Sequence, residues 1–473
     1  MNLVSSVKWS FLAELANKAI QPLVFIILAR ILTPDDFGIV AAAMLIIAFT
    51  QIFWEAGLGK AIIQLEGDIQ EAASVAFFAN ASLASLMALL LIVFASDLAQ
   101  FVSQDPTAES IIKVMSLQVI LGGLGSIHVA LLQREFFFKK LFWVRFATVS
   151  LPGLVSIPLA ITGWGYWSLV VGLVAGQLVQ LAILWVLSPW RPTMNCDPRN
   201  VWNIFQFGGW ASLSALLMWF YVWADILFIG YFLGVHELGI YRVGNQSVMM
   251  VFALIFGPLV PVLYSFLARA QGEPLVVQDI ANLLLRVVIW VSLPLSIFAA
   301  FFAQELSLVI FGNKWDGISA VVCFMSLVHG FSWIAGMNGE FYRAIGRPNI
   351  ESIVTGVVLL LYAATYYWSV QYGLERFLFA RVCLGFIALF LHFSVFKYVI
   401  GVGPIALLGK AMFPFFLSIC VFGGSRLFSD LSGLHPYLAI GMGLLGLLVV
   451  TLVFFIFYGA KTRSEFKLIN AWP

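Results

Sequence analysis

The chain has 473 residues, of which 25 are Lys or Arg and 23 are Asp or Glu, so only 10% are charged where a soluble globular protein has roughly 25%. Hydrophobic residues make up 62%, and because so few charges cannot cover a water-exposed surface, both a soluble enzyme and a disordered chain are excluded. The net charge of +2 gives no indication of nucleic-acid binding, and the composition predicts a polytopic membrane protein.

Fourteen apolar stretches are long enough to cross a membrane, since a membrane-crossing helix needs about 20 apolar residues. They cover residues 7–32, 37–62, 72–96, 109–133, 141–162, 165–188, 203–233, 237–266, 280–311, 317–342, 350–370, 375–399, 404–428 and 434–459. The first is expected to be a retained span rather than a signal peptide, because Glu14 and Lys18 interrupt it and no small-residue cleavage site follows. The sequence predicts an all-α fold with connections too short for a catalytic domain.

The distribution of Lys and Arg predicts which connections face the cytoplasm, because cytoplasmic loops are enriched in these residues. One set of alternate connections, together with Lys8 and the C-terminal tail, holds 17 basic residues, whereas the opposite connections and nearby helix ends hold seven. Both termini are therefore predicted to be cytoplasmic.

The two halves of the sequence resemble each other at a constant offset of 201 residues, as in the pairs Trp9 and Trp210, and Gly38 and Gly239. This offset corresponds to six helices, so the two halves are expected to be parallel repeats, which in transporters form two lobes around a central cavity. The predicted divisions are an N-terminal lobe at 1–200, a C-terminal lobe at 201–400, and two further helices with a tail at 401–473.

The first predicted span carries a polar stripe made of Ser10, Glu14, Asn17, Lys18 and Gln21. Their spacing places them on one helical face, and the rise of 1.5 Å per residue puts the fourth of them about 16 Å from the start of the span. A charge at this depth costs about 2.5–3.5 kcal/mol, so the stripe is expected to face a water-filled cavity where Lys18 contacts an anion and Asn17 and Gln21 contact substrate. Alternatively, Glu14 and Lys18 form only a structural ion pair; otherwise Glu14 is a candidate for ion coupling.

The second half of the sequence has a similar polar pattern in Arg242, Asn245 and Gln246. These residues share one helical face and are candidates for substrate binding. Arg242 lies close enough to the end of its span that its side chain could instead reach the membrane interface.

Asp225 is the deepest carboxyl group of the predicted seventh span, and Trp219 and Tyr221 lie one to two turns before it. The carboxyl group is a candidate for ion coupling, and the two aromatic side chains are candidates for contact with sugar rings. The alternative is a carboxylate neutralised by a neighbouring helix. Glu55, one turn after Gln51, is a further ion-coupling candidate.

No motif of enzyme chemistry is present, because the sequence lacks a Walker A loop, HExxH and GxSxG. The five histidines are scattered without ligand spacing, and the four cysteines have no CxxC spacing. We therefore expect a transporter with no catalytic residue, no metal site and no cofactor, driven by a proton or sodium gradient.

Several motifs together resemble the Wzx-type polysaccharide flippases of the MOP superfamily. They are ARILTPDDFGIV at 29–40, EAGLG at 55–59, AIIQ at 61–64, ALLQRE at 130–135, DILFIG at 225–230, LG at 233–234, FGNKW at 311–315 and AIGR at 344–347. The resemblance covers about residues 1–400, and it rests on the order and spacing of the motifs rather than on any one of them.

The resemblance implies fourteen helices in two six-helix lobes plus two C-terminal helices, in a bacterial cytoplasmic membrane. It implies that the chain moves an undecaprenyl-pyrophosphate-linked oligosaccharide outward by alternating access, with membrane lipids, a polysaccharide polymerase and a chain-length regulator as partners. Related flippases use cationic cavity residues against the pyrophosphate, which suits Lys18. The chain differs from the family at two places. Family members often have an Arg shortly before the Asp of the seventh span, whereas residues 221–224 of this chain are YVWA, and many have an Arg at the position of Gln246.

Two other functions stay open at this point. A MATE-type exporter of drugs or small metabolites, coupled to a cation, would use the same scaffold. A polymerase or ligase acting on the same lipid is the third alternative, which the short connections disfavour.

Overall fold

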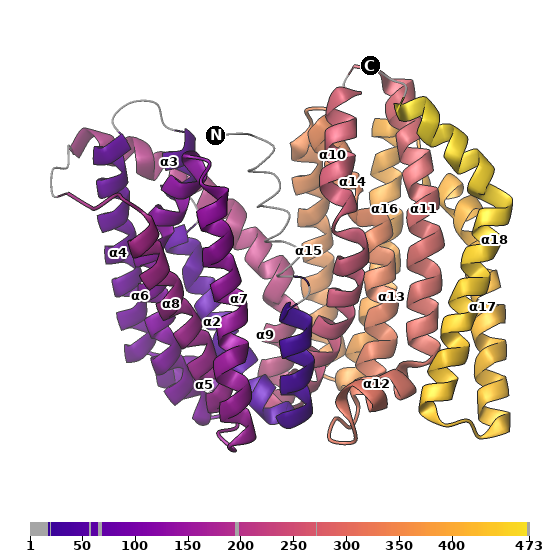
Figure 1. Ribbon diagram of the computed structural model, residues 1–473, viewed down its shortest axis with the longest axis horizontal. Coiled ribbons are helices and arrows are strands. Elements are labelled where there is room, and N and C mark those ends of the chain that lie inside the picture. The colour runs from indigo at the N-terminus through magenta and orange to yellow at the C-terminus, as the bar shows by residue number, and fades with distance from the viewer. Residues whose placement is uncertain are drawn as a thin grey trace. The chain divides into compact units, whose positions relative to one another are not determined.

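A computed structural model describes residues 18, 20–55, 58–64, 69–193, 198–270 and 272–470 of the chain (Figure 1). Within these ranges the secondary structure is helical and no strand occurs, which confirms the predicted all-α class. The contacts divide the chain into two compact units, Met1–Arg242 and Val243–Pro473. The predicted lobe boundaries at residues 200 and 400 stay a prediction.

In the described part of the first unit, a short apolar helix covers Ile20–Ile31. The helices that follow are α2 (Pro34–Glu55), α3 (Leu58–Gln64), α4 (Ile69–Val93), α5 (Ala95–Val102), α6 (Thr107–Arg134), α7 (Phe138–Ile161), α8 (Tyr166–Leu187) and α9 (Pro198–Phe256), which continues into the second unit.

The second unit contains the remaining helices. They are α10 (Leu259–Arg269), α11 (Pro274–Phe301), α12 (Ala303–Phe311), α13 (Ile318–Gly336), α14 (Asn338–Ala344), α15 (Pro348–Val370), α16 (Leu374–Ile400), α17 (Pro404–Ser432) and α18 (Pro436–Asn470).

Twelve helices in the described ranges are long and apolar enough to cross a membrane. One of them is the stretch Ala215–Phe256 of α9, whose 42 residues are about twice the length that one crossing needs. Gly234 interrupts this stretch with a φ of 85° and a ψ of −176°, so α9 consists of two helices joined at a break. The break separates the predicted spans 203–233 and 237–266; the total of fourteen spans stays a prediction.

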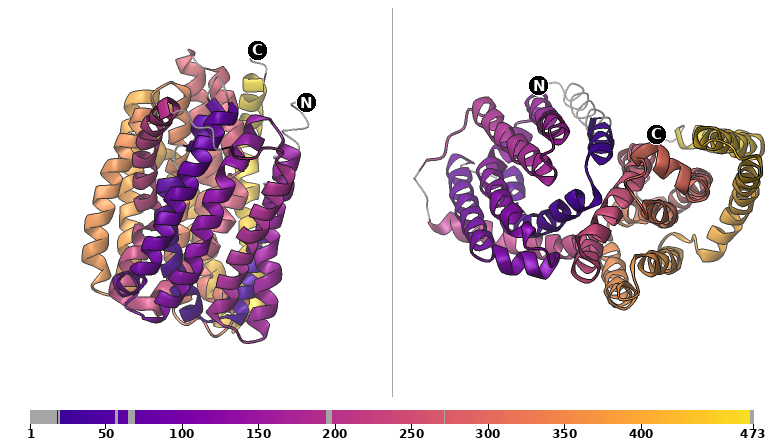
Figure 2. Two further views of the ribbon diagram at one scale, coloured as in Figure 1. Left: turned by 90° about the vertical axis from the view of Figure 1, so that its left-hand side faces the viewer. Right: turned by 90° about the horizontal axis from the view of Figure 1, so that it is seen from below.

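Small residues let the helices of each unit approach closely, as is common where membrane helices pack. In the first unit α6 packs against α2, α4 and α8. A Cβ atom at Gly123 of α6 would lie 2.5 Å from the Cβ atom of Ala84 in α4. In the second unit α11 packs against α13, where Gly330 faces Ser296, and α17 and α18 lie side by side against α11 (Figure 2).

Two backbones cross in contact near the start of α2. A Cβ atom at Gly38 would overlap the carbonyl oxygen of Val235, and a Cβ atom at Gly239 would overlap the carbonyl oxygen of Pro34. Adding 201 to Pro34 and Gly38 gives Val235 and Gly239, so the two contacts are reciprocal and join positions that are equivalent in the sequence repeat. Only glycine at both positions allows the second half of α9 to cross α2 at this distance.

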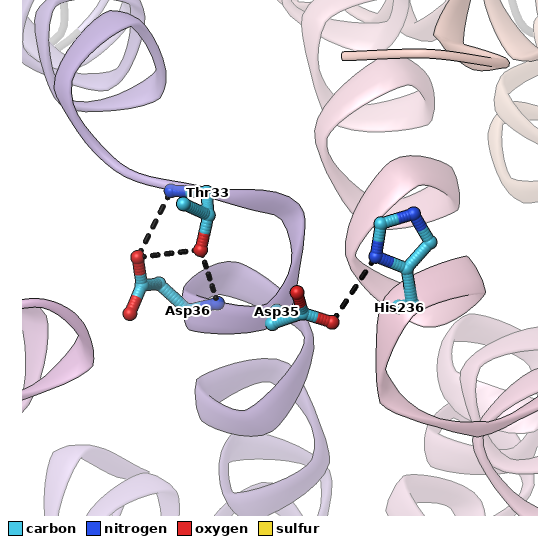
Figure 3. Close-up of polar contacts among 4 residues, drawn as sticks. All are labelled: Thr33, Asp35, Asp36 and His236. Carbon is cyan, nitrogen blue, oxygen red and sulfur yellow. Dashed lines mark hydrogen bonds and ion pairs between the residues drawn. The ribbon is translucent and has the colours of Figure 1, made fainter. Parts of the chain in front are cut away.

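The start of α2 is fixed by side chains at the same crossing (Figure 3). Thr33 donates hydrogen bonds from its backbone nitrogen and its Oγ1 to Asp36 Oδ2, at 2.9 and 2.7 Å, and its Oγ1 accepts one from the Asp36 backbone nitrogen at 3.3 Å. This is a capping box with Pro34 at the first helical position. Asp35 Oδ1 lies 3.1 Å from His236 Nδ1, and these residues also differ by 201.

Replacing either crossing glycine by alanine tests this packing. Gly38→Ala and Gly239→Ala each force a methyl group against a carbonyl oxygen, and we expect each to lower the free energy of unfolding by about 1–3 kcal/mol, as overpacking does. The measurement is the melting temperature of the purified protein in detergent. Gly356→Ala in α15 is the matched control, since no atom lies within 4 Å of its Cβ position. Unchanged melting of both crossing variants would contradict the account.

Candidate functional site

Asp225 is a buried carboxyl group in the first half of α9, with 6% of its surface exposed. The Tyr241 hydroxyl, from the second half of α9, donates a hydrogen bond of 2.5 Å to Asp225 Oδ2. Asp225 Oδ1 accepts a 2.8 Å hydrogen bond from the backbone nitrogen of Ile226. Both carboxyl oxygens are thus hydrogen-bonded, as a buried carboxyl group requires.

The break at Gly234 brings the two members of this hydrogen bond together. The helix reverses there, so Tyr241 returns to the level of Asp225 although the two are 16 residues apart. Tyr241 is fully buried, at 0% exposure. The sequence alone did not point to Tyr241, because a lone tyrosine in an apolar span carries no signal of its own.

Arg242 follows Tyr241 and brings a positive charge to the same part of the first unit. Its guanidinium carbon lies 5.3 Å from the centre of the Trp223 ring, which is within the range of a cation–π contact. The Asp225 carboxylate also interacts with this guanidinium through its charge. The side chain is half-buried, and its guanidinium group contacts the Trp223 ring and is within range of electrostatic interaction with the Asp225 carboxylate.

The two predicted sugar-contacting aromatic residues lie in different surroundings. Trp219 is half-buried and packs edge-on against Phe49 of α2, with ring centres 5.1 Å apart. Its Nε1 is buried and has no hydrogen-bond partner in the part of the chain that the structure describes. Tyr221 is 42% exposed and is therefore the more accessible of the two.

The polar stripe of the first helix is only partly within the described residues. Lys18 is half-buried and takes part in an interaction, and Gln21 is exposed. Glu14 and Asn17 lie outside the described residues, as does the side chain of Glu55.

In the second unit, Asn245 Oδ1 lies 2.9 Å from His329 Nε2, which is within hydrogen-bonding distance. Gln246 is half-buried. His329 also faces the ring of Phe252, with the ring centres 6.2 Å apart. The sequence indicated no partner for His329, because the contact joins α9 to α13. In the described ranges, no group of three His, Cys, Asp or Glu side chains converges as a metal site would require.

Comparison with known proteins gives one family match. Residues 27–320 match the family described as "Polysaccharide biosynthesis protein", which is more than half of the chain. Three curated proteins are similar over most of their length. They are the succinoglycan biosynthesis transport protein ExoT of Rhizobium meliloti (28% identity, covering 72% of this chain and 69% of that protein), the teichuronic acid biosynthesis protein TuaB of Bacillus subtilis (23%, 78% and 77%) and the lipopolysaccharide biosynthesis protein WzxC of Escherichia coli (22%, 74% and 71%).

Two solved structures share the fold. The lipid II flippase MurJ in an inward closed conformation matches with a TM-score of 0.76 at 12% identity, covering 95% of this chain and 99% of that chain. An inward-facing multidrug resistance transporter of the MATE family and MOP superfamily matches with a TM-score of 0.66 at 16% identity, covering 81% and 94%. At these identities the likeness shows the fold alone.

The Tyr241 hydrogen bond predicts a stability effect. Tyr241→Phe removes the donor and leaves a buried carboxyl oxygen without this partner, so we expect the free energy of unfolding to fall by about 1–3 kcal/mol. Thermal melting in detergent measures the change. Tyr264→Phe is the control, because Tyr264 is 46% exposed. Equal melting temperatures of the Tyr241 variant and the wild type would show that this hydrogen bond does not contribute to the stability of the fold.

Proposed function

The chain belongs to the polysaccharide biosynthesis protein family, and on that premise we propose that it is a flippase for a lipid-linked oligosaccharide. The family match over residues 27–320 carries the proposal. It is supported by a relative named as a succinoglycan transport protein and by a fold shared with a lipid II flippase. The resemblance of the sequence to the Wzx-type flippases is thereby confirmed.

The chain acts in the cytoplasmic membrane and moves its substrate without transforming it. Its helices are apolar enough to cross a membrane many times, which fits a substrate whose polyprenyl tail stays in lipid. The bias of Lys and Arg among the connections supports cytoplasmic termini. A polysaccharide polymerase and a chain-length regulator are the expected protein partners of such an exporter.

The diphosphate is the charged part of the substrate, and two cations of the first unit are its proposed ligands. Lys18 supplies an ammonium group from the first helix, and Arg242 supplies a guanidinium group whose flat fork suits phosphate oxygens. Gln21, Asn17, Asn245 and Gln246 would add hydrogen bonds, and Trp219 and Tyr221 would face sugar rings.

Asp225 provides a way to couple transport to an ion gradient. Its carboxylate interacts with Arg242, so the carboxylate and the substrate diphosphate compete for one guanidinium group. Protonation of Asp225 removes its negative charge and leaves Arg242 available to the diphosphate. Loss of the proton on the other side of the membrane would then favour release, so the proton and the substrate would cross the membrane in the same direction. Glu14 and Glu55 are further candidates for this role.

A MATE-type exporter on the same scaffold is the alternative function. This alternative is supported by the fold that the chain shares with the MATE-family transporter, at a TM-score of 0.66. The curated relatives, in contrast, are named for polysaccharide biosynthesis. Loss of the gene with unchanged surface polysaccharide and greater drug sensitivity would favour the exporter.

The role of Lys18 is tested by export in cells that lack the chromosomal gene. Lys18→Ala removes the proposed diphosphate contact, and we expect export of surface polysaccharide to fall at least roughly tenfold, since a charge-assisted hydrogen bond contributes about 1.5–3 kcal/mol. Lys18→Arg keeps the charge and should retain most of the export. Lys113→Ala is the control, because its ammonium group is exposed and paired with Glu109 at 2.6 Å. Normal export by Lys18→Ala at equal protein level would remove Lys18 from the mechanism.

The role of Asp225 is tested by its response to a proton gradient. Asp225→Asn keeps an oxygen that can accept the Tyr241 hydrogen bond but cannot exchange a proton. In liposomes we expect transport by this variant to be the same with and without a pH gradient, while the wild type is accelerated when the side from which the substrate is taken up is the more acidic. Asp430→Asn is the control, since Asp430 is 55% exposed and paired with Arg426. A variant that keeps the full response to the gradient would assign coupling to another group.

A further inference from the structure

The first unit contains a polar cavity that the proposed diphosphate site does not use. Its volume is about 380 Å³, and α2, α3, α6 and α8 form its walls. Among the described residues, four glutamine side chains line it: Gln51 from α2, Gln133 from α6, and Gln177 and Gln180 from α8. All of them belong to the same compact unit.

The spacing of residues along the helices explains why the cavity exists. Gln177 and Gln180 are three residues apart, so they lie on the same face of α8. Gly59 and Gly125 line the cavity without occupying it. A Cβ atom at Gly125 would lie 3.2 Å from a methyl carbon of Leu184, so glycine also allows α8 to lie close to α6 at the edge of the cavity.

The four amide groups have no hydrogen-bond partner among the described residues and are available to a ligand. Across the described ranges, none of these side chains takes part in a hydrogen bond, although Gln133, Gln177 and Gln180 are half-buried. Each primary amide carries two N–H donors and one carbonyl acceptor, so four of them present a dense set of both kinds. Partly buried amides in an apolar unit need such partners, which water or a ligand must supply.

Among the described residues that line the cavity, none carries a charged side chain. A diphosphate would lose its hydration there without gaining a cation, which is strongly unfavourable. An uncharged ligand rich in hydroxyl groups fits better, since every hydroxyl both donates and accepts a hydrogen bond and an amide can do the same. The volume lies in the range of about 300–1,000 Å³ that small-molecule sites occupy.

The cavity reaches from the middle of α6 and α8 to the end of the unit where a substrate made in the cytoplasm would arrive. Gln133 is the residue before the last one of α6, and Gln51 is four residues before the end of α2. Arg134, next to Gln133, belongs to the connections whose basic residues predict the cytoplasmic side.

We propose that this glutamine-lined cavity binds one uncharged sugar ring of the lipid-linked oligosaccharide while the diphosphate is held elsewhere by cations. The inference rests on the proposed flippase function and specifies how the glycan part of the substrate is recognised. The amide groups hydrogen-bond to the hydroxyl groups of the ring. The cavity therefore prefers a lipid that carries a neutral sugar next to its diphosphate over the same lipid without a sugar.

Equilibrium binding to the full chain in lipid nanodiscs tests this. The probes are undecaprenyl diphosphate and the same lipid carrying one glucose, galactose or N-acetylglucosamine. We expect the wild type to bind at least one of the glycosylated lipids about tenfold more tightly than the bare lipid, which corresponds to about one or two net hydrogen bonds. Gln177→Leu with Gln180→Leu should abolish this preference and leave binding of the bare lipid unchanged.

The matched control is Gln118→Leu, which changes a half-buried glutamine of α6 that does not line the cavity and should keep the preference. If the α8 pair fails to fold, Gln51→Leu with Gln133→Leu tests the opposite wall. A wild type that binds all the lipids equally, or a preference that survives in a folded cavity variant, would overturn the inference and leave the flippase function standing. A wild type that binds none of the lipids would instead remove the proposed function.

Discussion

Direct contact between two backbones, at Gly38 on α2 and Gly239 on the second half of α9, determines where the candidate site forms. The carbonyl oxygens of Val235 and Pro34 occupy the space that side chains would need at these glycines. The crossing therefore fixes the path of the chain after the break at Gly234. Tyr241 and the neighbouring guanidinium group then return to the level of Asp225, and without this path the carboxyl group would be left in an apolar unit without its donor.

In the proposed mechanism, different polar groups of the first unit recognise different parts of the substrate. The proposed diphosphate ligands Lys18 and Arg242 are cations, whereas the described lining of the cavity formed by α2, α3, α6 and α8 holds amides and no charged side chain. A lipid-linked oligosaccharide has the same division, with a charged linkage and uncharged sugar rings. Electrostatic attraction and hydrogen bonding to hydroxyl groups can then be adjusted separately, which would let related transporters keep the lipid linkage and change the glycan.

The sequence was sufficient for the features that depend on residues close together along the chain. Apolar length predicted the helices, and the interruption around residues 234–236 separated the two spans that meet at the break in α9. The offset of 201 residues paired Gly38 with Gly239 as equivalent positions, although the contact between them was seen only in the structure. Asp225 was identified as a candidate functional residue because it lies deep in a predicted span, where a charged side chain is energetically costly.

Features that depend on the packing of separate helices could not be predicted in this way. The donor to Asp225 depends on how the two halves of α9 align after the break, and periodicity within one helix carries no information on that alignment. His329 meets Asn245 across two helices, and so its partner was missed. The four cavity glutamines come from three helices, and each of them alone resembles an ordinary polar residue in a span.

The central claim is that this chain by itself moves a glycosylated polyprenyl diphosphate between leaflets. The most direct measurement uses the purified protein in liposomes that contain a fluorescent undecaprenyl-diphosphate oligosaccharide, with a membrane-impermeant quencher added outside. The account predicts that nearly all of the fluorescence becomes accessible to the quencher in protein-containing liposomes, against about half in empty ones. Accessibility that stays at the level of empty liposomes, together with uptake or release of organic cations by the same preparation, would contradict it.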